Sequence, residues 1–270
     1  MEREHITPQG VSVFHDKNEN IHSFCLCLYV RAGSLFETKE NNGISHFFEH
    51  IVFKNIHYQM GENLYQTLDR CGLDFNASTY EEFIQFIITG APAHFEEAAE
   101  ILTGIFEPIT LPEEVIDTER KRIKAEIREE DEESSLAYFT KKIAWKNTSL
   151  ERTITGKKKT LDKIKGKQLR KFQKEVLSSN NIFFYISGNY PETAVVTVTK
   201  LMENYPLTVM KKERKNLAPV PKRFFARKPK VYVKNSKKTC VCFSVDIDAS
   251  NYTLAEEKSD CLIFYLRVSS

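Results

Sequence analysis

The sequence is poor in glycine, with 10 glycines in 270 residues, and none of them falls in a loop motif that holds nucleotide phosphates. No G-x-G-x-x-G or P-loop pattern occurs, so a nucleotide cradle is not expected. A G-x-S-x-G nucleophile elbow is also missing, and no cysteine stands with a histidine in a recognisable nucleophile motif. The chain therefore gives no sign of nucleotide-dependent chemistry or of hydrolysis by a serine or cysteine.

Long apolar runs are missing too. A bilayer-spanning helix needs about 20 predominantly apolar residues, and no segment approaches that length. The first ten residues, MEREHITPQG, have neither the apolar core of a secretory signal nor the character of a transit peptide. With 41% hydrophobic and 28% charged residues, the composition is that of a folded globular protein. We therefore expect a cytoplasmic protein without a membrane partner.

An excess of one charge sign is also absent, since the net charge is only +2, but the charges are unevenly placed. Residues 126–133 are strongly acidic, whereas residues 211–238 are rich in Lys and Arg, with Glu213 as the sole acid. A basic run can bind nucleic acid, and a steep salt dependence of binding would reveal it. No aromatic-interleaved RNA motif or DNA-reading helix accompanies it, so we interpret it as a solvated linker without a nucleic-acid partner.

Cysteine is present, but its pattern favours core packing over ligation. The chain has Cys25, Cys27, Cys71, Cys240, Cys242 and Cys261. Each of the two C-x-C pairs lies in an apolar, β-forming segment, where side chains two residues apart share one face of a sheet. Four thiols could form a zinc site, but C-x-C within a strand is weak support for one, because free cysteine also behaves as a small buried hydrophobe. In a reducing compartment no disulfides are expected.

The hydrophobic pattern predicts an α+β fold with a largely antiparallel sheet and helices packed on one face. Two hairpins are expected, the first from 11–16 and 23–33 and the second from 74–80 and 82–90, with a further buried strand at 181–190. Helices are expected at 43–56, 60–72, 93–106, 113–134, 136–147, 161–177 and 191–205. Asn41, Asn42 or Ser45 is available to cap the first helix. We predict a domain at 1–210, followed at 211–270 by a basic linker and strands that complete the same sheet.

The chemistry of the chain is concentrated in residues 43–55, GISHFFEHIVFKN. On a helix, positions i, i+3 and i+4 share a face, so His46, Glu49 and His50 would converge. Two imidazoles one turn apart can bind a single Zn²⁺, although a catalytic zinc needs a third protein ligand. The same pattern also occurs on solvated polar helix faces. Its order, H-x-x-E-H, is the inversion of the H-E-x-x-H motif of zinc peptidases.

The third ligand is expected on the acidic helix at 113–134. Glu119 and Glu126 are two turns apart and therefore share a face, which lies beside the apolar stripe of Ile116, Ile123 and Ile127. A carboxylate on a face that packs is costly unless it is paired or bound to a metal. A solvated acidic helix explains Glu129–Glu133 well, but it explains Glu119 and Glu126 less well.

These motifs together resemble the pitrilysin/insulinase family of inverted zinc peptidases, in particular the catalytic N-terminal half of the mitochondrial processing peptidase type. Gly33, Ser34, Glu37 and Gly43 precede His46 as in the family signature, and the resemblance covers nearly the whole chain. Seventy-five residues lie between His50 and Glu126, close to the spacing in the family. The segments FNASTYEE, ITGKKKTLDKI and NIFFYISGNYP also resemble family blocks.

The resemblance implies a role for each of these residues. His46, His50 and Glu126 would bind Zn²⁺, and Glu49 would act as the general base on the attacking water. Glu119 would orient a ligand histidine. Asn76 and Ala77 would lie on the strand that pairs with the substrate backbone. Phe47 would pack the helix against its neighbours or, as the less favoured alternative, line a substrate pocket.

The resemblance also predicts that this chain has a partner. Family enzymes consist of two homologous halves that close over a chamber, and this chain carries one half, shortened at its end. We therefore expect a zinc metalloendopeptidase for short or unfolded peptides that works with a second homologous half, on a separate subunit or in a longer chain. The alternative is a non-catalytic or partner-dependent half of a two-part peptidase. The complete set of motif residues argues against a purely structural role.

Overall fold

The computed structural model describes residues 2–129 and 135–210. All of them belong to the first of two compact units, Met1–Pro219. The second unit, Val220–Ser270, lies outside the described residues. The linker and strands expected at 211–270, with the second C-x-C pair and Cys261, likewise lie outside them and stay a prediction.

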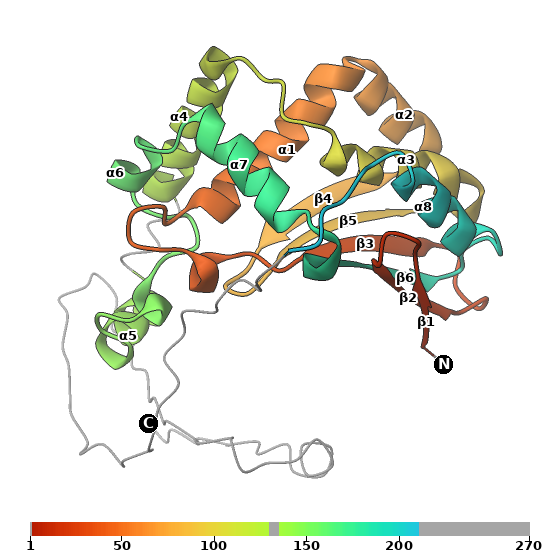
Figure 1. Ribbon diagram of the computed structural model, residues 1–270, viewed down its shortest axis with the longest axis horizontal. Coiled ribbons are helices and arrows are strands. Elements are labelled where there is room, and N and C mark those ends of the chain that lie inside the picture. The colour runs from red at the N-terminus through yellow and green to blue at the C-terminus, as the bar shows by residue number, and fades with distance from the viewer. Residues whose placement is uncertain (1, 130–134, 211–270) are drawn as a thin grey trace, which may run out of the picture. The chain divides into compact units, whose positions relative to one another are not determined.

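The described unit is built on a six-stranded sheet in the order β1-β2-β6-β3-β5-β4 (Figure 1). Its strands are β1 (Arg3–Ile6), β2 (Ser12–Lys17), β3 (Phe24–Val30), β4 (Asp74–Thr79), β5 (Ile84–Gly90) and β6 (Ile182–Gly188). All neighbouring strands are antiparallel except for the parallel pair β2 and β6. The predicted α+β class with a largely antiparallel sheet is therefore confirmed.

The helices are α1 (Ile44–Met60), α2 (Asn63–Cys71), α3 (Phe95–Thr103), α4 (Glu113–Glu129), α5 (Leu136–Ala144), α6 (Lys158–Leu161), α7 (Gly166–Val176) and α8 (Ala194–Met202). Figure 1 shows α1, α3, α7 and α8 together on one side of the sheet, as predicted. Within the described ranges, none of the helices combines the length and the apolar character needed to cross a membrane.

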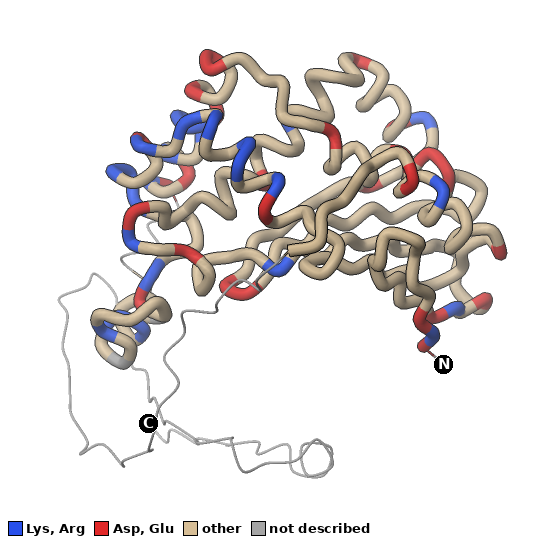
Figure 2. Tube along the Cα trace, viewed as in Figure 1, with Lys and Arg blue, Asp and Glu red and all other residues tan. Residues whose placement is uncertain are grey.

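The core lies between the sheet and these helices. Along β3, Phe24, Leu26 and Leu28 are almost fully buried on the helix side. The strands β6, β3 and β5 contain no charged residue, and in Figure 2 the charges gather on helices and loops. Cys25, which is half-buried, and Cys27, which is buried, occupy the positions between these residues, and their Sγ atoms are 3.4 Å apart. The first C-x-C pair therefore shares one face of the sheet, as predicted.

The first predicted hairpin is wrong. β2 and β3 run antiparallel, but β6 lies between them, parallel to β2 and antiparallel to β3. The connection between β2 and β3 is long enough to span one intervening strand, because strands in a sheet are about 4.8 Å apart. The second predicted hairpin, formed by β4 and β5, is confirmed, with Asp74 opposite Thr89.

Two other elements differ from their predictions. The helix expected over 161–177 forms only as α7, which begins at Gly166, since α6 ends at Leu161; Arg120 binds the segment between the two helices. Its guanidinium donates to the carbonyl oxygens of Leu161 at 3.0 Å and Ile164 at 2.7 Å. Strand β1 was not predicted, because all four of its residues are exposed and show no alternation between apolar and polar positions.

Helix α1 begins on a buried carboxylate. The side chain of Glu37 is fully buried, and it accepts hydrogen bonds from the backbone N–H groups of Gly43 at 2.8 Å and Ser45 at 2.9 Å. It also accepts one from the side-chain amide of Asn42 at 2.9 Å. A negative charge at a helix N-terminus satisfies unpaired N–H groups and is favoured by the helix dipole. Glu37 therefore performs the capping role that we expected of Asn41, Asn42 or Ser45.

We predict that Glu37→Gln destabilises the protein by about 1–3 kcal/mol, because the neutral amide cannot accept all three hydrogen bonds and leaves a buried donor unsatisfied. Urea unfolding measures this change in free energy. The matched control is Glu40→Gln, on the same loop, since Glu40 is exposed. Equal stability of the two variants would contradict the role that we assign to Glu37.

Candidate metal centre

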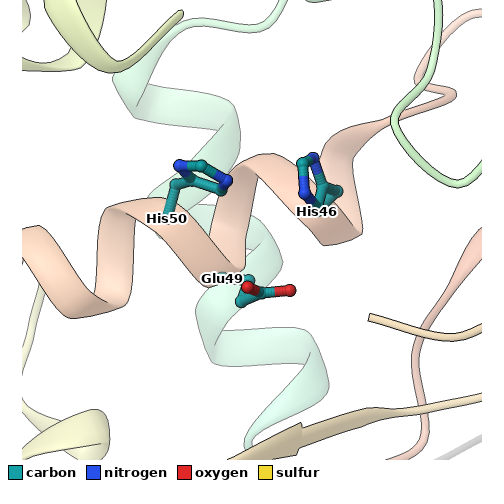
Figure 3. A group of neighbouring side chains, drawn as sticks. All are labelled: His46, Glu49 and His50. Carbon is teal, nitrogen blue, oxygen red and sulfur yellow. The ribbon is translucent and has the colours of Figure 1, made fainter. Parts of the chain in front are cut away.

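The centre begins with three side chains from α1. His46, Glu49 and His50 each offer an atom that can bind a metal, and these atoms lie within 4.8 Å of one another. Figure 3 shows the two imidazole rings on the same side of the helix, one turn apart. Their ring centroids are 4.7 Å apart. The opposite side of α1 carries Phe48 and Ile51, which are fully buried. Packing of this apolar face therefore fixes the direction in which the histidines point.

His46 is held neutral by its surroundings. Burial, and to a smaller extent the nearby His50, lowers the pKa of its imidazole to about 3. Its Nδ1 atom is buried and has no hydrogen-bond partner among the residues that the structure describes. A buried polar atom without a partner is costly in a folded protein. A neutral imidazole with an unpaired ring nitrogen is also the form that binds a metal ion.

His50 lies between two carboxylates of α4. Its Nδ1 atom is 3.7 Å from Oε2 of Glu119, and its Nε2 atom is 3.4 Å from Oε2 of Glu126. The close approach of the His50 imidazole is the main cause that lowers the pKa of Glu119. The two carboxylates thus contact different nitrogens of one ring. Glu126 is close to the centre through its contact with Nε2 of His50. The donor atoms that lie closest together are those of His46, Glu49 and His50.

Glu49 connects α1 to the edge strand β4. Burial raises the pKa of its carboxyl group, and a 2.5 Å hydrogen bond from the hydroxyl of Thr79 opposes that rise in part. Thr79 is the last residue of β4. A buried carboxyl group with a raised pKa is a candidate for proton transfer.

Asn76 and Ala77 both lie on β4, which forms one edge of the sheet. The side chain of Asn76 is exposed, and its Oδ1 accepts a 2.8 Å hydrogen bond from the backbone N–H of Ala77. The side chain of Ala77 faces the core. The strand that carries both residues is therefore tied to the α1 cluster through Thr79.

Phe47 is not at a surface that a substrate can reach. Its side chain is fully buried, and the guanidinium of Arg120 lies 5.5 Å from the centre of its ring. Arg120 belongs to α4 and also binds the carbonyl oxygens of Leu161 and Ile164. We therefore correct the substrate-binding option for Phe47 and assign this residue to the packing between α1 and α4.

Three further residues act on the centre; Glu37 was noted only as part of the family signature, and Thr79 and Lys54 were not predicted. Glu37 begins α1, Thr79 binds Glu49, and the ammonium of Lys54 lies 4.0 Å from Oε1 of Glu119. Alternation along β4 contained a signal for Thr79, because it places Thr79 on the same face as Ala77. Helical spacing contained a signal for Lys54, because this residue lies one turn after His50 on the same face of α1. For Glu37 the signal was an acid shortly before a helix start.

Sequence and structure comparisons point to one family. The family model described as Insulinase (Peptidase family M16) matches residues 12–158. The uncharacterized zinc protease YmxG of Bacillus subtilis is 27% identical over 198 residues, which is 73% of this chain and 48% of that protein. The beta subunit of the mitochondrial-processing peptidase of Rattus norvegicus is 31% identical over 155 residues, 57% of this chain and 32% of that subunit.

Solved structures share the fold. A protease from Helicobacter pylori aligns with a TM-score of 0.69 at 19% identity, over 80% of this chain and 53% of that one. An inactive M16 peptidase domain from Pseudomonas fluorescens aligns with a TM-score of 0.70 at 14% identity, over 81% and 54% of the two chains. The first half of the periplasmic protease PqqL from Escherichia coli aligns with a TM-score of 0.69 at 20% identity, over 80% and 49%.

The chain spans about half the length of YmxG and of these aligned structures, and about a third of the processing-peptidase subunit. The family match extends over more than half of the chain and includes the H-x-x-E-H helix and both glutamates of α4. The chain therefore belongs to the insulinase family, peptidase family M16.

Proposed function

We propose that this chain is the zinc-binding half of a metalloendopeptidase. The observation that carries the proposal is the environment of the two histidines. His46 has a buried ring nitrogen without a partner among the described residues, and His50 offers Nε2 beside the carboxylate of Glu126. Two neutral imidazoles and one carboxylate form the donor set of many catalytic zinc sites, which keep a further position for water or substrate. The residues present therefore fit zinc, with His46, His50 and Glu126 as its ligands.

Glu119 would act on the metal through His50. Its carboxylate is near Nδ1, the nitrogen that faces away from Glu126. A hydrogen bond from Nδ1–H to a carboxylate selects the tautomer whose Nε2 lone pair is free, and it holds the ring in place. The lowered pKa of Glu119 keeps this carboxylate charged. Glu119 is therefore a positioning residue.

Glu49 would be the general base of peptide hydrolysis. When bound, zinc supplies a Lewis acid that polarises a carbonyl oxygen and lowers the pKa of water. Burial raises the pKa of Glu49, so this carboxylate binds a proton more readily than an exposed one and can later return it to the leaving amine. The hydroxyl of Thr79 would hold the carboxylate in the orientation needed for this transfer.

The substrate would be a short or unfolded peptide. Strand β4 has a free edge within the described sheet, and Thr79 connects that edge to Glu49. An extended peptide can add to such an edge through backbone hydrogen bonds, which give affinity with little sequence preference. Binding beside Asn76 and Ala77 would require the Asn76 side chain to release the N–H of Ala77. A folded globular protein could not align its backbone in this way.

We further propose that the active enzyme contains a second homologous half. The chain spans about half of YmxG and of the first half of a periplasmic protease, and about a third of a processing-peptidase subunit. The fold of this chain also resembles that of an inactive M16 domain. A non-catalytic or partner-dependent half of a two-part peptidase is therefore the alternative. The complete set of His46, Glu49, His50 and Glu126 favours the catalytic role. The cytoplasmic location stays a prediction.

Zinc binding can be tested by metal analysis after dialysis. We expect tightly held zinc at the α1 centre, and we expect His50→Ala to retain about one zinc per chain fewer than the wild type because the site then keeps a single imidazole. The matched control is His57→Ala on the same helix, which should retain the metal. Tight zinc at wild-type stoichiometry in His50→Ala would refute the ligand assignment.

The base can be tested with Glu49→Gln, which keeps the size of the side chain but cannot accept the proton. We expect peptide hydrolysis by the complete two-half enzyme to fall by roughly 10²-fold or more, with its zinc retained. Glu62→Gln is the control, since Glu62 is exposed just after α1. Unchanged hydrolysis in Glu49→Gln would show that another group is the base.

The need for a second half can be tested on the chain by itself. We expect the monomer, verified by light scattering, to bind zinc but to cleave unstructured peptides poorly. Addition of the homologous half, or expression of the complete parent chain, should restore cleavage. Robust cleavage by the monomer that a chelator abolishes would show that one half is sufficient.

A further inference from the structure

A second group of metal-binding side chains lies at the base of the β4–β5 hairpin. Asp74 pairs with Thr89, so the residues just before β4 and just after β5 are brought together. Cys71 is the last residue of α2, where Gly72 turns the chain with a left-handed backbone. His94 and Glu97 follow β5, in a short 3₁₀ turn and in the first turn of α3. The hairpin thus brings Cys71 close to two residues that lie more than twenty positions further along the chain.

The distances in this group match a tetrahedral metal site. Sγ of Cys71 is 3.9 Å from Oε1 of Glu97, and Nδ1 of His94 is 3.5 Å from the same oxygen. One donor atom from each residue fits within a mutual distance of 4.8 Å. Tetrahedral zinc bound at its usual 2.0–2.3 Å would separate such atoms by about 3.3–3.6 Å. Small side-chain movements are therefore sufficient to reach that geometry.

The surroundings of the group favour a ligand over simple packing. The Nδ1 atom of His94 is buried, and its contact with Glu97 does not have the geometry of a hydrogen bond. It has no other such partner among the described residues. The thiol of Cys71 is only 4% exposed and directed at a carboxylate, which a purely apolar role does not require.

We propose that Cys71, His94 and Glu97 form a second metal site, for a borderline-soft divalent cation such as zinc. One sulfur, one imidazole nitrogen and one carboxylate oxygen suit that class of ion, and the ready access of solvent to His94 and Glu97 leaves room for a water as the fourth ligand. The site is separate from the α1 centre. The start of α1 packs near α6, whereas α2 and α3 lie at the other end of the sheet (Figure 1).

A metal at this position would hold the two ends of the hairpin together. It would join the residue that precedes the edge strand β4 to the helix that follows β5, and thereby close a loop of 24 residues, 71–94. Closing a loop in this way restricts the unfolded chain and favours the folded hairpin. Occupancy would therefore stabilise the strand proposed to bind peptide, without contacting the peptide itself.

Cobalt provides a probe that separates the two centres. The α1 centre contains no thiol, so an absorption band from thiolate-to-Co²⁺ charge transfer reports only a site that includes cysteine. We would titrate Co²⁺, under reducing conditions, into the His50→Ala chain, where the α1 centre is impaired. One equivalent should produce the band, and Cys71→Ala in the same background should abolish it. Cys25→Ala is the matched control and should keep the band.

The proposal is overturned if His50→Ala shows no thiolate band, or if the band survives Cys71→Ala. Because Cys71 is buried, circular dichroism must verify that Cys71→Ala is folded. If Cys71→Ala is not folded, Glu97→Gln provides the test. The Glu97 side chain is about one-third exposed, and glutamine has nearly the same shape as glutamate. We expect Glu97→Gln to weaken Co²⁺ binding by roughly tenfold or more. Unchanged affinity in that variant overturns the proposal. Failure of zinc binding at the α1 centre has no effect on this outcome.

Discussion

The buried carboxylate of Glu37 determines where helix α1 begins, and the rest of the centre depends on that position. Each residue of an α-helix is rotated by about 100° from the one before it. A start shifted by one residue would therefore turn His46 and His50 away from α4 and direct Phe47 and Phe48 out of the core. Because the hydrogen bonds from Gly43 and Ser45 go to one fixed side chain, the apolar and metal-binding faces of α1 have a single orientation.

Helix α4 provides the other half of this arrangement. Ile116 and Ile123 bury its inner face, and Arg120 anchors it to the segment between α6 and α7. Glu119 and Glu126 are carried on the same rigid element, so they reach opposite nitrogens of His50 without adjustment of a loop. Lys54 near Glu119 and Arg122 near Glu126 partly compensate the negative charge of the two carboxylates. Two packed helices thus present a set of polar groups whose geometry follows from their apolar faces.

Sequence reasoning found the parts of the site that depend on local spacing. The H-x-x-E-H helix, the pair of glutamates on α4 and the β4–β5 hairpin could all be predicted, because helical and strand periods act over a few residues. Contacts between distant segments could not be predicted in the same way. The hydrogen bond from Thr79 to Glu49 and the approach of His94 to Cys71 depend on how β4 and β5 meet α1, α2 and α3. Burial of Phe47 likewise depends on α4, which lies more than sixty residues further along the chain.

The position of β6 has a consequence for how the chain folds. Ser12 on β2 pairs with Phe183 on β6, so the middle of the sheet joins segments about 170 residues apart. Proteins rich in such distant contacts fold slowly, because a long loop must close before the pairing stabilises it. During synthesis, β2 and β3 each keep an unpaired edge until Gly188 has left the ribosome. Nascent chains shorter than this would expose apolar strands that can pair with other chains, and such intermediates are the usual substrates of chaperones.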